Sequence, residues 1–186
     1  MLMNSLRGQL LIASPDLHGP MFARSVILML DHGAEGAMGV ILNQPMKTVI
    51  SDLSGKIFED EFEWEKPLHL GGPVPGTLLV LHDIEEMADR EIIPGVYMTI
   101  EASSVQEVIR RRPEPSLVIA NYAGWGPGQL EDEFGLDSWV TLPATPDFVF
   151  WSGDDDLWRV VTRRYRASQL SQLLNLRTIP RDPSLN

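Results

Sequence analysis

The sequence predicts an α+β fold built on a mixed, mainly antiparallel sheet. Strand-like segments follow one another through the first 100 residues, and helix-like segments concentrate after them. The 186 residues, of which 44% are hydrophobic, suffice to bury one sizeable core. Because regular strand–helix alternation is missing, a doubly wound parallel sheet is disfavoured. We therefore expect a single domain over residues 1–186.

Three aliphatic segments near the N-terminus predict strands, at residues 8–13, 25–30 and 36–42. The second segment is almost continuously apolar, which indicates a strand covered on both faces. Only residues 31–35 separate the second segment from the third, so these two are expected to form an antiparallel hairpin.

The next segment predicts a short surface helix. Thr48 belongs to the residue types that cap helices, and we expect a helix from Thr48 to Leu53. The acidic residues 59–66 continue it and are expected to be exposed. Further along, high β propensity predicts three strands, at residues 77–82, 95–100 and 117–121.

A helix is predicted between the last two of these strands. Ser103 with Gln106, and Ser104 with Glu107, form two overlapping capping-box patterns. Arginines follow at the end where positive charge complements the helix dipole, and Pro113 stops the helix.

The last third of the chain predicts a short helix at 129–134, strands at 139–142 and 147–151, and a long final helix. Gly135 suits the left-handed residue that ends the short helix. The acids Asp154 to Asp156 suit the start of the long helix, which is expected to reach about Leu174. Its predicted buried residues are Leu157, Val160, Val161, Leu170, Leu173 and Leu174.

Composition limits the classes of function. The chain has no cysteine, which excludes disulfides, thiolate nucleophiles and cysteine-ligated metals. Its apolar runs are too short for a signal-peptide core or a membrane span, so we expect a cytoplasmic protein without a membrane anchor. The net charge of −11 makes nucleic acid an unfavoured partner overall.

The stretch NYAGWGPGQLEDEF, residues 121–134, looks at first like a dinucleotide-binding loop because it joins a strand to a helix. However, Gln129 stands where the third glycine is needed, and Pro127 removes a backbone donor. The acids at 131–133 already neutralise the positive end of the helix. A structural joint is the better interpretation, with Pro127 at the first helical position, Trp125 buried and Gln129 bonded to a loop carbonyl.

The four histidines, His18, His32, His69 and His82, lack any metal-ligand spacing, and we expect no metal and no cofactor. No serine has the context of a hydrolase nucleophile. His69 and His82 flank the GGPV loop, so a small-molecule or catalytic site near Asn43, His69 and His82, with Asp83 or Glu85, remains an alternative. We expect a binding protein more than an enzyme.

Arginines form a stripe on the predicted final helix: Arg159, Arg163 and Arg166 share one face, and Arg164 lies beside them. The stripe is open to two interpretations. It is expected to be a solvated face that pairs with the acidic segment 59–65 of the same chain, and direct DNA binding is the alternative.

Four segments together resemble one family, the AlgH (YqgE) family of bacterial proteins: GQLLIASPDLHGPMFARSVILMLDH (8–32), GAMGVILNQP (36–45), HLGGPV (69–74) and ANYAGWGPGQLEDEF (120–134) with Trp139. The resemblance implies an α+β fold with a bifurcated sheet, part of it curled into a small barrel, surrounded by helices. Members are often labelled transcriptional regulators. The resemblance implies no catalytic residues, and it is loose after about residue 154.

Glycine, proline and polar residues end several predicted strands, and we expect them to form one rigid surface for a protein partner or a ligand. The candidate residues are Asn43, Gln44, Pro45, Gly71, Gly72, Pro73, Trp125, Gly126 and Gln129.

Overall fold

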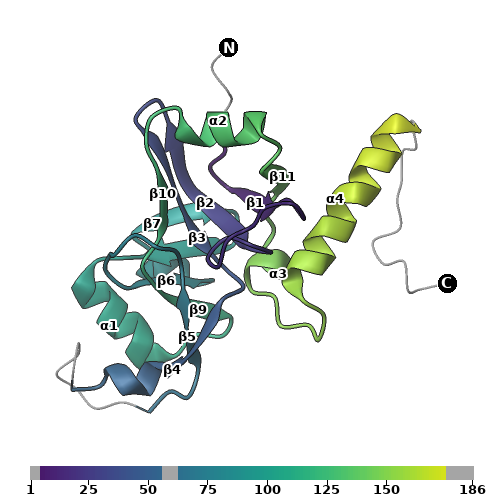
Figure 1. Cartoon of the computed structure of the whole chain (residues 1–186). Helices are drawn as coiled ribbons and strands as arrows, with labels where there is room; N and C mark the ends of the chain where they lie inside the picture. The colour runs from purple at the N-terminus through teal and green to yellow at the C-terminus, as the bar shows by residue number, and fades with distance from the viewer. Residues whose placement is uncertain (1–4, 56–62, 175–186) are drawn as a thin grey trace.

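The computed structural model describes residues 5–55 and 63–174, and it contains two sheets and four α-helices (Figure 1). The five-stranded sheet has the order β10 (Ala123–Trp125), β3 (Gly36–Ile41), β2 (Val26–Gly33), β1 (Gln9–Ala13) and β11 (Trp139–Pro143). The six-stranded sheet has the order β4 (Pro45–Val49), β5 (Pro67–Leu70), β9 (Ser116–Ala120), β6 (Leu79–His82), β8 (Val96–Thr99) and β7 (Arg90–Ile93). Among the strand pairs, β5 and β9 are parallel and the others are antiparallel.

The two sheets branch from each other where the chain passes between them. Strand β3 of the five-stranded sheet leads directly to β4 of the six-stranded sheet, and β9 leads back to β10. We call this place the crossover. It confirms the α+β fold with a mixed, mainly antiparallel, bifurcated sheet. In the described residues β10 and β11 remain edge strands, so the curl of the strands stops short of a closed barrel.

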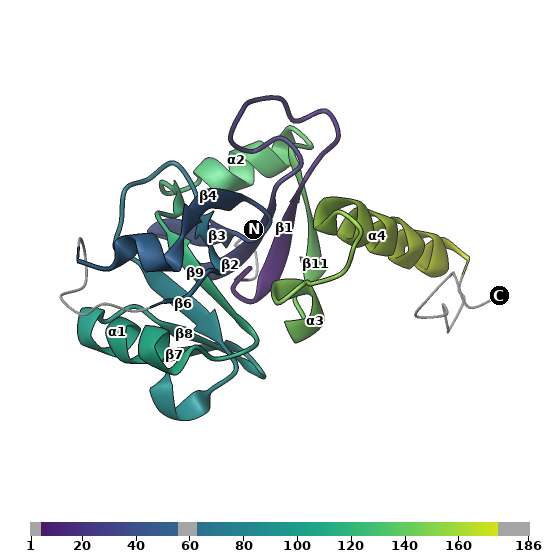
Figure 2. The same cartoon turned by 90° about the horizontal axis from the view of Figure 1, so that it is seen from below.

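Alternating side chains along the strands explain how the layers pack. In β1, Leu10 and Ile12 join the core between the sheets, whereas Leu11 and Ala13 face the opposite side. Helix α2 (Gln129–Gly135) covers that opposite side through the fully buried Leu130. Helix α1 (Ala102–Arg111) covers the outer face of the six-stranded sheet in the same way (Figure 2).

Helix α4 (Leu157–Leu173) lies beside β1 and β11 and then projects away from the sheets (Figures 1 and 2). Its first turns contribute Leu157 and Val161 to the core between the sheets. The predicted burial of Leu170 and Leu174 is wrong, because they are 55% and 57% exposed. The side chain of Leu173 lies outside the described residues.

Several local predictions are wrong. Residues 147–151 do not form a strand: α3 (Pro146–Val149) is a helical turn, with proline at its start. Thr48 does not cap a helix, since it lies within β4, and a 3-10 turn η1 (Ile50–Leu53) follows with Val49 before it. A second 3-10 turn, η2 (Glu85–Met87), lies between β6 and β7.

The predicted helix ends also need correction. Helix α1 begins earlier than the predicted capping boxes require, after Glu101, and the Glu101 side chain makes no capping hydrogen bond. Gly135 is the last residue of α2 and has no positive φ, and the left-handed residue nearby is Asp137. Asp156, in contrast, caps α4 as its acids predict, since its side chain accepts from the Arg159 N–H.

The acidic segment 59–66 lies partly outside the described residues. Within the described part, Glu63 and Glu65 are exposed as predicted, whereas Trp64 is buried against η1. None of the helices in the described ranges has the length and apolar character to span a bilayer.

Candidate functional site

The crossover brings together two of the three predicted loop segments, 43–45 and 71–73. The Ile41 N–H donates to the Gly71 carbonyl at 2.9 Å, and the Leu70 N–H donates to the Gln44 carbonyl at 2.9 Å. Backbone hydrogen bonds therefore fix the two loops against each other.

Gly71 and Gly72 are required here for close backbone approach. A Cβ at Gly71 would lie 2.4 Å from the Asn121 carbonyl oxygen, and one at Gly72 would lie 2.3 Å from the Tyr122 carbonyl carbon. Both glycines are buried. They allow β5 and the segment after β9 to touch, so their part in the candidate surface is structural.

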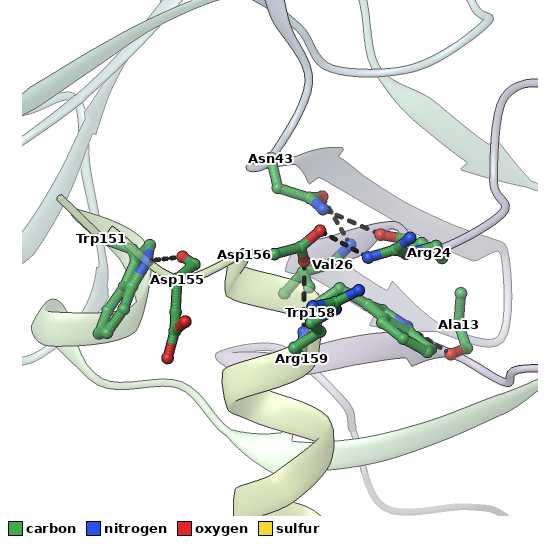
Figure 3. Close-up of polar contacts among 9 residues, drawn as sticks. All are labelled: Ala13, Arg24, Val26, Asn43, Trp151, Asp155, Asp156, Trp158 and Arg159. Atoms are coloured by element: carbon green, nitrogen blue, oxygen red, sulfur yellow. Dashed lines mark hydrogen bonds and ion pairs between the residues drawn. The ribbon is translucent and has the colours of Figure 1, made fainter. Parts of the chain in front are cut away.

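The Asn43 and Gln44 side chains also bond within the protein. Asn43 Oδ1 accepts from the Val26 N–H, and its Nδ2 donates to the Arg24 carbonyl, both at 2.9 Å (Figure 3). Gln44 Nε2 donates to the Met21 carbonyl. These bonds hold the 14–25 loop against the crossover. Both the Oδ1 and the Nδ2 atom of Asn43 are therefore hydrogen-bonded.

The third segment, 125–129, lies further along the five-stranded sheet. Trp125 pairs with Ala37 across β10 and β3, and Ala37 precedes Asn43 by six residues. In an extended strand this separation corresponds to about 20 Å. The segment is linked to the crossover through the 14–25 loop, because Phe22 stacks on Trp125 with ring centroids 6.5 Å apart.

Sequence reasoning missed the residue that organises this third segment, Glu133. Glu133 Oε2 accepts from the indole N–H groups of Trp125 and Trp139, at 3.0 and 2.7 Å. Its Oε1 accepts from Gln129 Nε2 at 3.1 Å. We call these four residues the Glu133 network. The spacing of Glu133 one helical turn after Gln129 was the available signal. Its two tryptophan partners lie on different strands, Trp125 on β10 and Trp139 on β11, so their contact with Glu133 leaves no such spacing.

Gln129 does not bond a loop carbonyl as predicted. Its Oε1 accepts from the Gly126 N–H at 3.1 Å, which closes the turn before α2. Pro127 is not the first helical residue either, since α2 begins at Gln129 after the left-handed Gly128. Trp125 is buried as predicted, and T-shaped contacts join it to Trp139 and Phe22 to Trp139.

Four candidate residues remain exposed: Pro45, Pro73, Gly126 and Gln129. The loop after Gly72 reaches the outer edge of β10, because Val74 and Tyr122 exchange backbone hydrogen bonds at 3.0 and 3.1 Å. The Tyr122 ring lies close to Gly76 on one side and to Gly124 on the other. Pro73 and Gly126 thus flank one exposed edge built from glycine and proline.

The histidine alternative does not assemble into one cluster. His69 is on β5 and His82 is on β6, and β9 runs between them, so the strands lie about 10 Å apart. Asn43 is already bonded to Arg24 and Val26. In the described ranges, no three histidine, aspartate or glutamate side chains are grouped to hold a metal ion.

His82 is fully buried and both ring nitrogens are bonded. Its Nδ1 accepts from the Ile84 N–H at 3.2 Å, and its Nε2 lies 2.7 Å from the Thr99 hydroxyl, which itself donates to the Met87 carbonyl. Burial lowers the pKa of His82, against smaller opposing effects of Asp83 and Asp89. The neutral ring therefore serves a structural role.

His69 differs because its buried Nδ1 has no hydrogen-bond partner in the described structure. Burial lowers the pKa of His69, a backbone bond at Pro67 opposes this, and the charge of Lys66 lowers it further.

His32, by contrast, connects three elements: its Nδ1 accepts from the Leu6 N–H, and its Nε2 lies 3.2 Å from Glu131 on α2.

The four arginines of the predicted stripe are all exposed on α4. Arg163 lies 3.8 Å from Asp155, so the ion pair found within the described residues joins it to this acid. The predicted pairing with segment 59–65 falls largely on residues 59–62, which lie outside the described residues. The base of α4 is well anchored (Figure 3). Trp158 Nε1 donates to the Ala13 carbonyl at 2.8 Å, and Arg24 both pairs with Asp156 at 2.8 Å and covers the Trp158 ring.

The known proteins to which this chain is similar agree with this architecture. A family model described as AlgH-like matches residues 10–169. A UPF0301 protein from Chlamydia pneumoniae is 35% identical, over 97% of this chain and 95% of its own length. A UPF0301 protein from Ruegeria pomeroyi is 36% identical, over 85% of this chain and 90% of its own.

Two solved structures have similar folds. The solution structure of the AlgH protein from Pseudomonas aeruginosa aligns with a TM-score of 0.70 and 29% identity, and covers 94% of this chain and 95% of that one. The crystal structure of protein DIP2367 from Corynebacterium diphtheriae aligns with a TM-score of 0.69 and 26% identity, and covers 84% of this chain and 85% of that one.

Proposed function

The chain belongs to the AlgH-like family, and we propose that it is a cytoplasmic binding protein that exerts a regulatory effect through a protein partner. The proposed partner surface is the exposed glycine and proline edge around Pro73, Gly124 and Gly126, with Gln129 at its margin. The proposal needs no cofactor and no catalytic group.

One observation carries this proposal: the edge is both exposed and held rigidly. Tyr122 is bonded to Val74, the Gly126 N–H to Gln129, and the Gly76 N–H to Asn121 Oδ1 at 3.3 Å. A surface that is already ordered loses little conformational entropy when a partner binds. The polar side chains nearby are bonded within the protein, which favours recognition over chemistry.

The direction of the backbone at Gly124 supports a protein partner in particular. Ala123 and Trp125 pair with Gly39 and Ala37 on β3. The backbone N–H and carbonyl of Tyr122 face the opposite edge, where they bond to Val74. In an antiparallel strand the peptide groups of alternate residues face opposite edges, so the Gly124 N–H and carbonyl face outward. An extended segment of a partner can hydrogen-bond to such groups.

The test compares partner binding by the parent protein with binding by Pro73→Glu and Gly126→Glu. A Cβ at Gly126 has open space, with Gln129 Oε1 at 4.0 Å as the nearest atom, and Pro73 is exposed, so both variants are expected to fold. Pro94→Glu is the matched control, because Pro94 is exposed beside β7, at the edge of the six-stranded sheet opposite to β4.

Partners captured with the parent protein are purified and titrated against each variant by calorimetry. We expect both edge variants to weaken binding at least tenfold, which corresponds to about 1.4 kcal/mol, and the control to leave it unchanged. Retention of every partner at parental affinity by both edge variants would refute this surface.

A further inference from the structure

Helix α4 carries an outward face that is not used to hold the helix on the sheets. The residues at this face are Arg159, Arg163, Arg166, Leu170 and Leu174, which recur at helical spacing and are all exposed. Leu157 and Val161 lie on the opposite side of the helix and are buried. We call these five residues the α4 outer face.

The α4 outer face has two parts. Its first half is basic, and between residues 157 and 174 the sequence has four arginines and no acid. Its second half presents two leucines, Leu170 and Leu174, each more than half exposed. A partner for this face must therefore offer acidic groups next to an apolar side chain.

This chain itself offers such a surface at the end of α2. Leu136, directly after α2, is 78% exposed, the largest exposed fraction among the large exposed hydrophobic residues of the described chain. Asp132 lies one helical turn before it, Asp137 follows it, and both are exposed. No ion pair joins either aspartate to another described residue. Asp132 and Leu136 repeat, with opposite charge, the spacing of Arg166 and Leu170.

We propose that α4 of one copy docks on the end of α2 of a second copy, in a reciprocal two-fold dimer. Arg166 then faces Asp132 of the other copy, and Leu170 faces its Leu136. A two-fold arrangement makes both contacts twice, which is the usual closed form for two identical chains. The apolar contact supplies the affinity, and the charges set the register.

Charge selects a second copy over other occupants of this face. Nucleic acid would use the arginines alone and would leave Leu170, Leu174 and Leu136 in water, while the net charge of −11 repels its phosphates. A second copy satisfies the arginines and the leucines together. This inference is independent of the partner surface proposed above, which lies on the edge of β10.

The first test is the mass of the full-length protein in solution. Sedimentation equilibrium at up to several hundred micromolar is expected to give twice the monomer mass of 20.8 kDa, with dissociation favoured by salt. A mass that stays at 20.8 kDa over this range overturns the proposal. Species that grow beyond the dimer overturn the closed two-fold form.

The decisive test uses charge reversal in two separate proteins. Arg166→Glu alone and Asp132→Arg alone each place like charges at both contacts, so each is expected to weaken dimerisation at least tenfold. An equimolar mixture of the two restores an attractive pair at both contacts and is expected to dimerise like the parent protein. Both changes are at exposed positions, so folding is expected to be retained.

Two outcomes of the mixing experiment separate this proposal from its rivals. Dimerisation that neither charge reversal weakens overturns the proposed contact. Failure of the mixture to dimerise, with both variants folded by circular dichroism, overturns the pairing of Arg166 with Asp132. Leu170→Glu and Leu136→Glu are expected to give monomers that no charge reversal rescues, because they remove the apolar contact.

Discussion

Helices α2 and α4 are attached to the same five-stranded sheet in opposite ways. Helix α2 is short, yet its Leu130 is fully buried, its Glu133 accepts from two tryptophans, and its Glu131 reaches His32. Helix α4 is much longer, and within the described residues it is held by its first half, through Leu157, Trp158, Val161 and Tyr165. Length therefore does not indicate how strongly a helix is fixed here.

The difference between the two helices shows which polar groups are already bonded within the protein. Polar groups that are bonded within a protein add stability and are not available to a partner. The inward side of α2 and its first turns are used in this way, so the α2 part of segment 121–134 is mainly a structural joint. The exposed arginines and leucines of α4 contribute little to the fold, and the dimer proposed above would use Arg166 and Leu170 between molecules.

The largest expected difference in unfolding free energy between the two helices comes from a pair of leucine truncations. Leu130→Ala removes a fully buried side chain under α2 and is expected to lower the free energy of unfolding by about 2–5 kcal/mol. Leu170→Ala removes a half-exposed side chain on α4 and is expected to change it by less than about 0.5 kcal/mol. Denaturant titration at dilute concentration measures both, and equal losses would contradict the comparison.

A second test isolates the polar contacts of α2. Glu133→Ala leaves two buried indole N–H groups without an acceptor, so we expect a loss of about 2–3 kcal/mol in unfolding free energy. Asp132→Ala is the control, because Asp132 is the preceding residue of the same helix and is exposed. It should shift the denaturation midpoint little, and a similar loss in both variants would show that the Glu133 network adds nothing.

The pH dependence of stability tests whether the two histidines of the six-stranded sheet, His69 and His82, also serve to stabilise the fold. His69 and His82 have pKa values lowered by burial, so the unfolded chain binds protons that the folded chain does not. Stability is thus complete above the ordinary histidine pKa near 6.5 and is lost as the pH falls below it. Each group contributes at most about 1.4 kcal/mol per pH unit.

The measurement is the unfolding free energy between pH 7.5 and 5 for the parent protein and for His18→Gln and His69→Gln. His18 is exposed in the 14–25 loop, so its replacement is the control and should keep the parental slope. His69→Gln should reduce the slope. A parental slope in His69→Gln would contradict the role given to its buried ring.

The sequence predicted the strands with continuous aliphatic runs well and the other strands poorly. Strands β1, β2 and β6 follow from local aliphatic runs, which are sufficient because both faces of these strands are covered. Strand β10 has three residues, two of them Ala123 and Gly124, with little β propensity of their own. It forms because β3 and Val74 pair with it, and such distant pairing leaves no local signal.

The same reason explains the errors at the candidate surface. Residues 43–45 and 71–73 were predicted as neighbours from their composition, and the crossover does bring them together. The burial of Gly71 and Gly72 follows from a close approach to residues 121 and 122, which no local pattern encodes. The exposed leucines of α4 were predicted buried because periodicity identifies an apolar position but not the surface that covers it.

The smallest loss of unfolding free energy is expected at Asp156, at the base of α4, and it tests how α4 is attached. Asp156 Oδ1 accepts from the Arg159 N–H at 3.3 Å, while Oδ2 pairs with Arg24, and both side chains are substantially exposed. An exposed ion pair contributes little, and a lost helix cap costs about 1 kcal/mol, so Asp156→Ala should cost about 1 kcal/mol. Asp156→Asn keeps the cap and removes the charge, so it should cost less than half as much.

Hydrogen exchange of the backbone amides shows which helix the Asp156→Ala change destabilises. Asp156→Ala should speed exchange of the amides in the first turns of α4 while those of α2 keep their parental rates, because Asp156 caps α4 and does not contact α2. Asp155→Ala, which removes only the 3.8 Å contact to Arg163, should leave both helices unchanged. Faster exchange in α2 as well would mean that the two helices open together, and that the base of α4 supports the whole sheet.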